Sequence, residues 1–268
     1  EILHLAPQAK VLPVLRRGNV RGAVTAGLTP QQGAADTAEI LERCAAGKID
    51  TLVLLGSDPL SDVPDADLAR RGLAGARNII SIDAFMTPSS SQAHVVLPAA
   101  AFGEKNGTTT NLEGRISNVA QKITPAGTSR PDWMIACELA LALGKDLGFN
   151  SVEDVTAKLV KTVAQFAPAA NTKALRHDGV LMNHPSPLTL SRTTLPIPDR
   201  NSYDYRIVSF RKLYDAAVGT AKSPSLAHLA EGASIVVHPL DLARIGVEIG
   251  SNVQVISAKS TVVLPVTT

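Results

Sequence analysis

Short apolar runs alternate with helical patterns through the first hundred residues of the chain. Continuous apolar runs of this kind are typical of strands that are covered on both faces of a parallel sheet. They occur at 51–55, 78–83 and 95–97. Helix-compatible segments with capping residues precede or separate them, at 36–45, 65–73 and 87–93. This order predicts an α/β fold whose doubly wound sheet is mostly parallel.

The pattern changes after Phe102. An Asn106-Gly107 pair stands before a threonine run, which is a strong hairpin signal, and Glu113-Gly114-Arg115 predicts a second turn. We expect a strand over 116–123 after that turn. Apolar residues at helical spacing then predict helices over 132–143 and 151–166, whereas the glycine-punctuated segment 19–30 is expected to be loop and turn.

The last third of the chain has a different character. Residues 167–204 are proline-rich and weakly periodic, which indicates a long connector. Beyond it, short strands at 205–210, 235–237, 253–255 and 262–264 surround one small helix at 239–245, a pattern that favours a compact β-barrel. We therefore expect an α/β domain over 1–149, a helix and linker over 150–204, and a barrel domain over 205–268. That barrel is expected to be truncated, because the sequence stops at Thr268 in mid-pattern.

Charge and hydropathy exclude several classes of function. The 268 residues carry a net charge of +2 and only 3% aromatic residues, so we expect no nucleic-acid partner. The longest apolar run, 95–102, is far shorter than the roughly 20 residues that cross a membrane, so direct membrane insertion is not expected. The chain begins at Glu1 without methionine and shows no signal-peptide pattern, and we expect it to be part of a longer protein.

Metal-binding and nucleophilic motifs are not evident in the sequence. Cys44 and Cys137 are the only cysteines, too few for an iron–sulfur cluster or a four-thiolate zinc site. The six histidines lack ligand spacing. Ser89-Ser90-Ser91 is not framed as a nucleophile elbow and is better explained by helix capping. We expect no metal site and no catalytic residue in this chain.

Two turns could bind a nucleotide-like ligand. Gly56-Ser57-Asp58-Pro59 and the turn that starts at Asp83 both follow predicted parallel strands, where open α/β sheets bind such ligands. Neither matches a dinucleotide or phosphate-loop motif, and any doubly wound domain must also turn at these points. Glu104, Glu113 and Asp83 would serve as acid–base carboxylates only if they lay close together. For Glu113 we favour an ionic brace at its turn, in which Arg115 bridges the carboxylate or backbone carbonyl groups.

One stretch resembles a known family. His94-Val95-Val96-Leu97-Pro98, followed by Glu104-Lys105-Asn106-Gly107-Thr108 and Asn111-Leu112-Glu113-Gly114-Arg115, is similar to the molybdopterin oxidoreductase superfamily. The Glu-Gly-Arg form looks most like the large iron–sulfur subunit family of respiratory complex I, the G-type subunits of NADH-quinone oxidoreductase. Segments from Asn19, Leu54 and Asp83 also fit that family, and the region from Arg206 to Val253 resembles the superfamily's carboxyl-terminal double-psi barrel.

The chain departs from the cofactor-binding pattern of that superfamily. His94 replaces the usual Asp, Ser209-Phe210-Arg211 stands where Gly-Arg is frequent, and Tyr214 follows where His is common. No Cys or Ser is framed as a metal ligand. The resemblance thus implies a pocket that has lost its cofactor, with these vestigial candidates: Gly56, Asp58, Asp83, Ser209 and Arg211.

The resemblance also implies a function for this segment of the parent protein. The segment would be a structural, non-catalytic part of a proton-pumping NADH:quinone oxidoreductase, without a redox centre of its own. Iron–sulfur clusters are expected in an amino-terminal part outside this sequence. The expected partners are other subunits of the hydrophilic arm, peripheral on the cytoplasmic side of a membrane. The alternatives are a fragment of an active molybdopterin enzyme such as a formate dehydrogenase, and a free-standing small-molecule binding module.

Overall fold

The computed structural model describes residues 8, 14–15, 17–30, 33–183, 205–210, 216–257 and 260–268. The chain divides into two compact units, Glu1–Thr193 and Thr194–Thr268. The three domains expected at 1–149, 150–204 and 205–268 stay a prediction.

A three-stranded parallel sheet organises the first unit, in the order β1-β2-β3. Its strands are β1 (Thr51–Leu55), β2 (Asn78–Asp83) and β3 (Val95–Pro98). The register pairs Leu52 with Ile79 and Ile82 with Leu97. All three strands lie where the apolar runs predict them.

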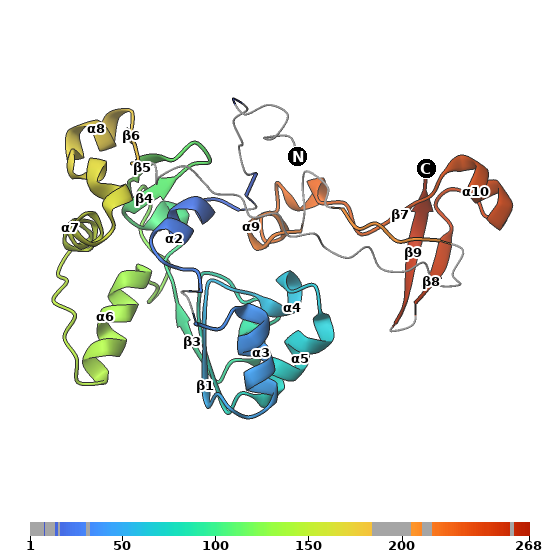
Figure 1. Ribbon diagram of the computed structural model, residues 1–268, viewed down its shortest axis with the longest axis horizontal. Helices are drawn as coiled ribbons and strands as arrows, with labels where there is room; N and C mark the ends of the chain where they lie inside the picture. Colours follow the sequence, from blue (N-terminus) through green and yellow to red (C-terminus); the bar gives the residue numbers. More distant parts are fainter. Residues whose placement is uncertain are drawn as a thin grey trace. The chain divides into compact units, whose positions relative to one another are not determined.

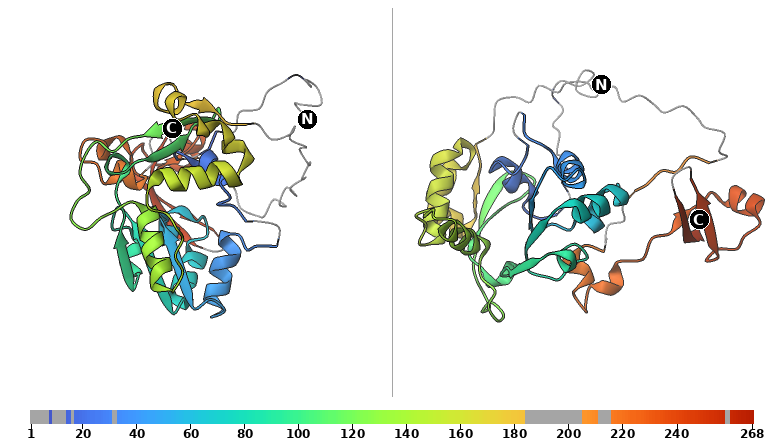
Figure 2. Two further views of the ribbon diagram at one scale, coloured as in Figure 1. Left: turned by 90° about the vertical axis from the view of Figure 1, so that its left-hand side faces the viewer. Right: turned by 90° about the horizontal axis from the view of Figure 1, so that it is seen from below.

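Helices cover both faces of this sheet (Figures 1 and 2). On one face lie α3 (Thr37–Ala45) and α5 (Ala66–Gly75), and on the other lies α6 (Asp132–Ala142). The turns between strands hold α4 (Pro59–Asp62) and the short 3-10 helix η1 (Ser90–Gln92). A mixed α/β fold with a parallel sheet is therefore confirmed.

Two clusters of buried apolar side chains hold these layers together. On the α3 and α5 face, Cys44 and Leu73 pack with side chains of β1 and β2. On the other face, Ile135 of α6 packs with Ile82 and Ala99. Capping follows the sequence: Asp36 accepts from the Glu39 N–H at 2.9 Å and so begins α3.

A small antiparallel sheet and its helices complete the first unit. The strands are β4 (Gly107–Thr110), β5 (Arg115–Val119) and β6 (Val180–Leu181), in the order β4-β5-β6. The helices α7 (Val152–Thr162), η3 (Ala164–Ala170) and α8 (Thr172–His177) lie together beside this sheet. Ile116 of β5 and Phe166 of η3 belong to one buried cluster. A further 3-10 helix, η2 (Phe102–Glu104), precedes β4.

Four expectations in this unit are wrong in detail. The segment 19–30, expected to be loop, contains helix α2 (Val20–Thr25). Gly107 begins a strand and forms no hairpin turn, whereas the second predicted turn, at Glu113-Gly114-Arg115, is confirmed by the hairpin turn at Asn111–Gly114, with Gly114 at φ 89°. The expected helix over 151–166 ends earlier, and the expected connector over 167–204 contains part of η3, all of α8 and β6. The rest of that connector lies outside the described residues.

The second unit contains one small mixed sheet. Strand β9 (Thr261–Thr267) lies between β7 (Ile235–Val236), to which it is parallel, and β8 (Asn252–Ile256), to which it is antiparallel. The helices are α9 (Val218–Ala221), η4 (Ala227–Leu229) and α10 (Pro239–Ile245). Residues 205–210 are not a strand, which corrects that expectation. The described part of this unit forms no closed barrel, so the double-psi barrel is not confirmed.

Candidate functional site

The carboxyl edge of the parallel sheet brings three predicted pocket residues together. Gly56 and Asp58 follow β1, and Asp83 ends β2. Because adjacent parallel strands end at the same edge, these residues share one region, and Asp58 acts electrostatically on Asp83.

Asp58 is buried, with 3% of its surface exposed. Its Oδ1 accepts a hydrogen bond from the Ser89 backbone N–H at 3.0 Å and a second from the Ser89 hydroxyl. The Ser89 oxygen in turn accepts from the Leu60 N–H at 3.0 Å. This network ties the turn after β1 to the segment before η1. Asp58 therefore acts as an internal brace.

Local capping occupies the neighbouring hydroxyl groups as well. The Thr87 N–H donates to Ser90 Oγ at 2.6 Å, and the Ser90 N–H donates to Thr87 Oγ1 at 3.0 Å. Ser91 Oγ donates to the Thr87 carbonyl at 2.8 Å. The two bonds between Thr87 and Ser90 are of the capping kind, whereas Ser89 makes no side-chain capping bond to η1, so the capping role expected of Ser89–Ser91 is not confirmed for Ser89.

Asp83 lies in a different environment. Burial raises the pKa of its carboxyl, and the nearby carboxylates Asp58 and Asp132 raise it further. Hydrogen bonds from the backbone N–H groups of Phe85, at 3.2 Å, and Ala84 act in the opposite direction and lower this pKa. The edge is thus rich in negative charge.

Gly56 does not form a cradle for a ligand. Its φ of 55° permits the tight turn after β1, but a Cβ at this position would meet nothing within 4 Å. Its N–H donates to the Ile82 carbonyl at 2.9 Å. The main-chain donor that a phosphate group would need is already used inside the sheet.

The remaining predicted pocket residues are not placed at this edge by the structure. Ser209 is exposed and belongs to the second unit, and Arg211 lies outside the described residues. None of the described interactions brings Glu104 or Glu113 together with Asp83 as an acid–base pair. Glu104 Oε2 instead accepts from the Ala101 N–H at 2.8 Å. Arg115 donates to the Asp178 carbonyl at 3.3 Å, outside the turn, and the turn's Leu112 carbonyl accepts from Arg21 instead, so the expected brace by Arg115 is not confirmed.

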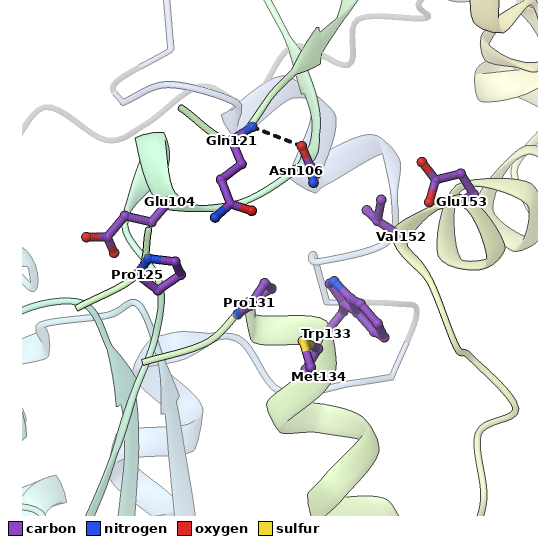
Figure 3. Close-up of a pocket in the computed structure, with 9 residues that line it drawn as sticks. All are labelled: Glu104, Asn106, Gln121, Pro125, Pro131, Trp133, Met134, Val152 and Glu153. Carbon is purple, nitrogen blue, oxygen red and sulfur yellow. Dashed lines mark hydrogen bonds between the residues drawn. The ribbon is translucent and has the colours of Figure 1, made fainter. Parts of the chain in front are cut away.

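A separate pocket of about 290 Å³ opens beside the amino-terminal end of α6, and the sequence patterns did not predict it (Figure 3). Nine residues line it: Glu104, Asn106, Gln121, Pro125, Pro131, Trp133, Met134, Val152 and Glu153. They come from η2, the residues that flank the hairpin strands β4 and β5, the loop before α6, and the first turns of α6 and α7. The only sequence signal was the single tryptophan close to a proline at a predicted helix start.

The described residues form neither a metal-binding cluster nor a membrane span. Among them, no group of three or more His, Cys, Asp or Glu side chains could hold a metal ion. None of the helices that the structure describes has both the length and the apolar character to cross a membrane. His94, which departs from the superfamily pattern, accepts the Ile79 N–H on Nδ1 at 3.0 Å and joins the sheet.

Comparison with known proteins identifies one family. The molybdopterin oxidoreductase family matches residues 9–142. The alpha subunit of the NADPH-Fe(3+) oxidoreductase of Geobacter sulfurreducens is 26% identical over 91% of this chain and 31% of its own length. The second G-type subunit of NADH-quinone oxidoreductase from Rhizobium meliloti is 41% identical over 40% of this chain and 12% of its own length. The alpha subunit of the F420-dependent formate dehydrogenase of Methanocaldococcus jannaschii is 27% identical over 79% of this chain and 35% of its own length. The chain thus spans about a third of the first of these relatives.

Proposed function

Because the chain belongs to the molybdopterin oxidoreductase family, we propose that it is a structural portion of the large iron–sulfur subunit of an NADH:quinone oxidoreductase. In this role it supports electron transfer from NADH to quinone and carries no redox centre itself. Two observations support the proposal. The relative with 41% identity is a G-type subunit of NADH-quinone oxidoreductase, and the Glu113-Gly114-Arg115 turn has the form typical of that family.

The proposal that this segment holds no molybdopterin depends on the residues at the carboxyl edge of the sheet. A molybdopterin would need donors for its phosphate group, yet the Gly56 N–H is already bonded within the protein, and the Asp58 carboxylate is itself an acceptor that offers a phosphate no hydrogen bond. Asp83 and Asp132 add negative charge there, and the amine of Lys105 is paired with Asp132. These residues do not fit an anionic cofactor. We therefore assign the edge to holding the fold.

The same proposal assigns the iron–sulfur clusters to the part of the parent protein outside this sequence. A cluster needs four thiolates, whereas this chain has two cysteines, one of which, Cys44, is fully buried. The partners would be other subunits of the hydrophilic arm, and the chain would lie at the periphery of a membrane complex, on its cytoplasmic side.

A second candidate is part of an active molybdopterin enzyme. The formate dehydrogenase relative favours it, because that match extends over 79% of this chain, against 40% for the NADH-quinone oxidoreductase relative.

Metal and pterin analysis of the native complex distinguishes the two candidates. The complex that contains this chain is purified, its metals are measured by inductively coupled plasma mass spectrometry, and its pterins are measured by fluorescence after oxidation. We expect iron but neither molybdenum nor tungsten in stoichiometric amount, and we expect the other subunits of an NADH:quinone oxidoreductase to co-purify. One molybdenum or tungsten with its pterin per chain would overturn the proposal in favour of the second candidate.

A further inference from the structure

The pocket in Figure 3 has the chemistry of a cation site. From its lining we infer that it binds an arginine side chain presented by a peptide segment of a partner protein. The inference rests on the proposed function only for the source of that peptide, a neighbouring subunit. Its chemical basis lies in the residues of the pocket.

The ionisable residues that line the pocket are all acidic. Glu104 and Glu153 contribute carboxylates, and the lining contains neither Lys nor Arg. Glu104 is engaged with the Ala101 N–H, and in Figure 3 its carboxylate points away from Trp133. Glu153 is exposed, makes none of the described ion pairs, and extends from the first turn of α7 toward the pocket. Glu153 therefore supplies a charge that a bound cation could neutralise.

The side-chain amides above the pocket offer an acceptor. Asn106 Oδ1 is used by the Gln121 N–H at 2.9 Å, and Gln121 Nε2 donates to the Ile123 carbonyl at 3.1 Å. The described hydrogen bonds leave Gln121 Oε1 without a donor. A guanidinium carries five N–H donors and no acceptor, so it suits a carboxylate and an amide oxygen on two sides of one pocket.

The opposite wall favours a flat cation over a compact one. Trp133 lies with Pro131 and Met134 at the start of α6 and faces the space below the two amides. An indole ring attracts a cation placed over its face, and a guanidinium can also stack on it. The volume of about 290 Å³ lies at the lower limit for small-molecule pockets, and it is large enough for one long side chain.

Trp133 makes the inference directly measurable, because it is the only tryptophan of the chain. The purified chain is titrated with the blocked tripeptide Gly-Arg-Gly while tryptophan emission is recorded, and N-acetyltryptophanamide corrects for collisional quenching. We expect a saturable change that weakens as salt is raised. The same peptide with citrulline in place of arginine keeps the shape but lacks the charge, and it should produce no saturable change.

Two matched variants test the contribution of the carboxylate. Glu153→Gln should weaken arginine-peptide binding about two- to fivefold, the range of one partly exposed ion pair. Glu42→Gln removes an exposed carboxylate on α3, outside the pocket, and should leave the binding unchanged. Circular dichroism verifies that both variants are folded.

Three outcomes would overturn the inference. The citrulline peptide could bind as tightly as the arginine peptide, or Glu153→Gln could bind as tightly as the parent chain. Free arginine could also bind as tightly as the peptide, in which case the pocket is a small-molecule site. None of these results bears on the metal and pterin content, so a failure here is distinguishable from a failure of the proposed function.

Discussion

Asp58 follows β1 and Asp83 ends the neighbouring parallel strand β2, yet their carboxyl groups lie in different environments. Asp58 has 3% exposure and receives two hydrogen bonds from Ser89, which compensate for its burial. Asp83 is only partly buried, and burial together with two nearby carboxylates raises its pKa. A raised pKa means that ionisation of Asp83 costs more in the folded chain than in the unfolded chain.

This difference predicts a pH-dependent effect of Asp83→Asn. Since the folded pKa is raised, the stability contributed by Asp83 is complete below its unfolded pKa of about 3.9 and is lost as the pH rises through the folded value. The variant keeps an oxygen for the Phe85 N–H but carries no charge. We expect it to be more stable than the parent chain at pH 7 and to lose that advantage near pH 3.5, as measured by urea unfolding.

Asp146→Asn is the matched control for this prediction. Asp146 is exposed and also accepts from the backbone N–H two residues ahead, that of Gly148, at 2.8 Å. It should show no comparable gain at pH 7. An equal gain in both variants, or a less stable Asp83→Asn at pH 7, would contradict the explanation.

The residues of the sheet edge could be predicted from the sequence, but their states could not. The ends of parallel strands can be located from apolar runs, so Gly56, Asp58 and Asp83 were predictable as neighbours. Whether a carboxylate faces a ligand or a hydroxyl depends on segments that are distant in sequence, such as Ser89 for Asp58. The Trp133 pocket was missed for the same reason, because η2, the hairpin, α6 and α7 meet there only in the folded chain.

The contact between α3 and α5 depends on two glycines at the element scale. A Cβ at Gly75 would lie 2.7 Å from Cα of Ala45, and one at Gly72 would lie 2.8 Å from Cδ2 of Leu41. Both distances are too short for real atoms, so the glycines let the helices approach. This close approach buries Cys44 and Leu73 against the sheet.

Gly75→Ala should therefore destabilise the chain. Helix propensity alone would make alanine more favourable by up to about 1 kcal/mol, so the sign of the effect is informative. We expect a net loss of about 1–3 kcal/mol, typical of overpacking, measured by urea unfolding. Gly107→Ala is the control: nothing lies within 4 Å of a Cβ there, and it should be neutral or slightly stabilising. A stabilised Gly75→Ala would exclude the proposed steric conflict.

Elements with strong periodicity were predictable, and elements set by their context were not. The strands β1 to β3 and the helices α3, α5, α6 and α10 lie close to their predicted ranges. The hairpin signal at Asn106-Gly107 was misleading, because Gly107 begins β4, whereas the second predicted turn is present: Gly114 takes a positive φ there and lies close to Arg21 and Met182. The apolar segment 205–210 is not a strand, since composition indicates strand preference but does not supply a neighbouring strand.

At the scale of the whole molecule, the two units differ in the size of their cores. In the second unit the buried apolar side chains of the described residues are those of Leu242 and Val266, whereas the first unit contains three clusters of buried side chains. Since apolar burial is the main favourable term in folding, the second unit has the weaker source of stability.

Hydrogen exchange should report this difference in stability between the two units. We expect the amides of β8 and β9 to exchange faster than those of β1 and β2, because opening the second unit exposes less apolar surface. The measurement is mass spectrometry of peptides after timed exposure of the chain to deuterium oxide. Equal protection of the two sheets would show that the second unit is stabilised by contacts beyond its own buried residues.

Strand β1 buries Leu52 and Leu54 but leaves Val53 and Leu55 each 52% exposed on the other face. Helix α6 packs over β2 and β3 on that face, through Ile82 and Leu97. Val53 and Leu55 thus form a small apolar surface that is exposed to solvent beside α6. At high protein concentration, such an exposed apolar surface favours self-association of the chain, and mild detergent or glycerol should reduce it during purification.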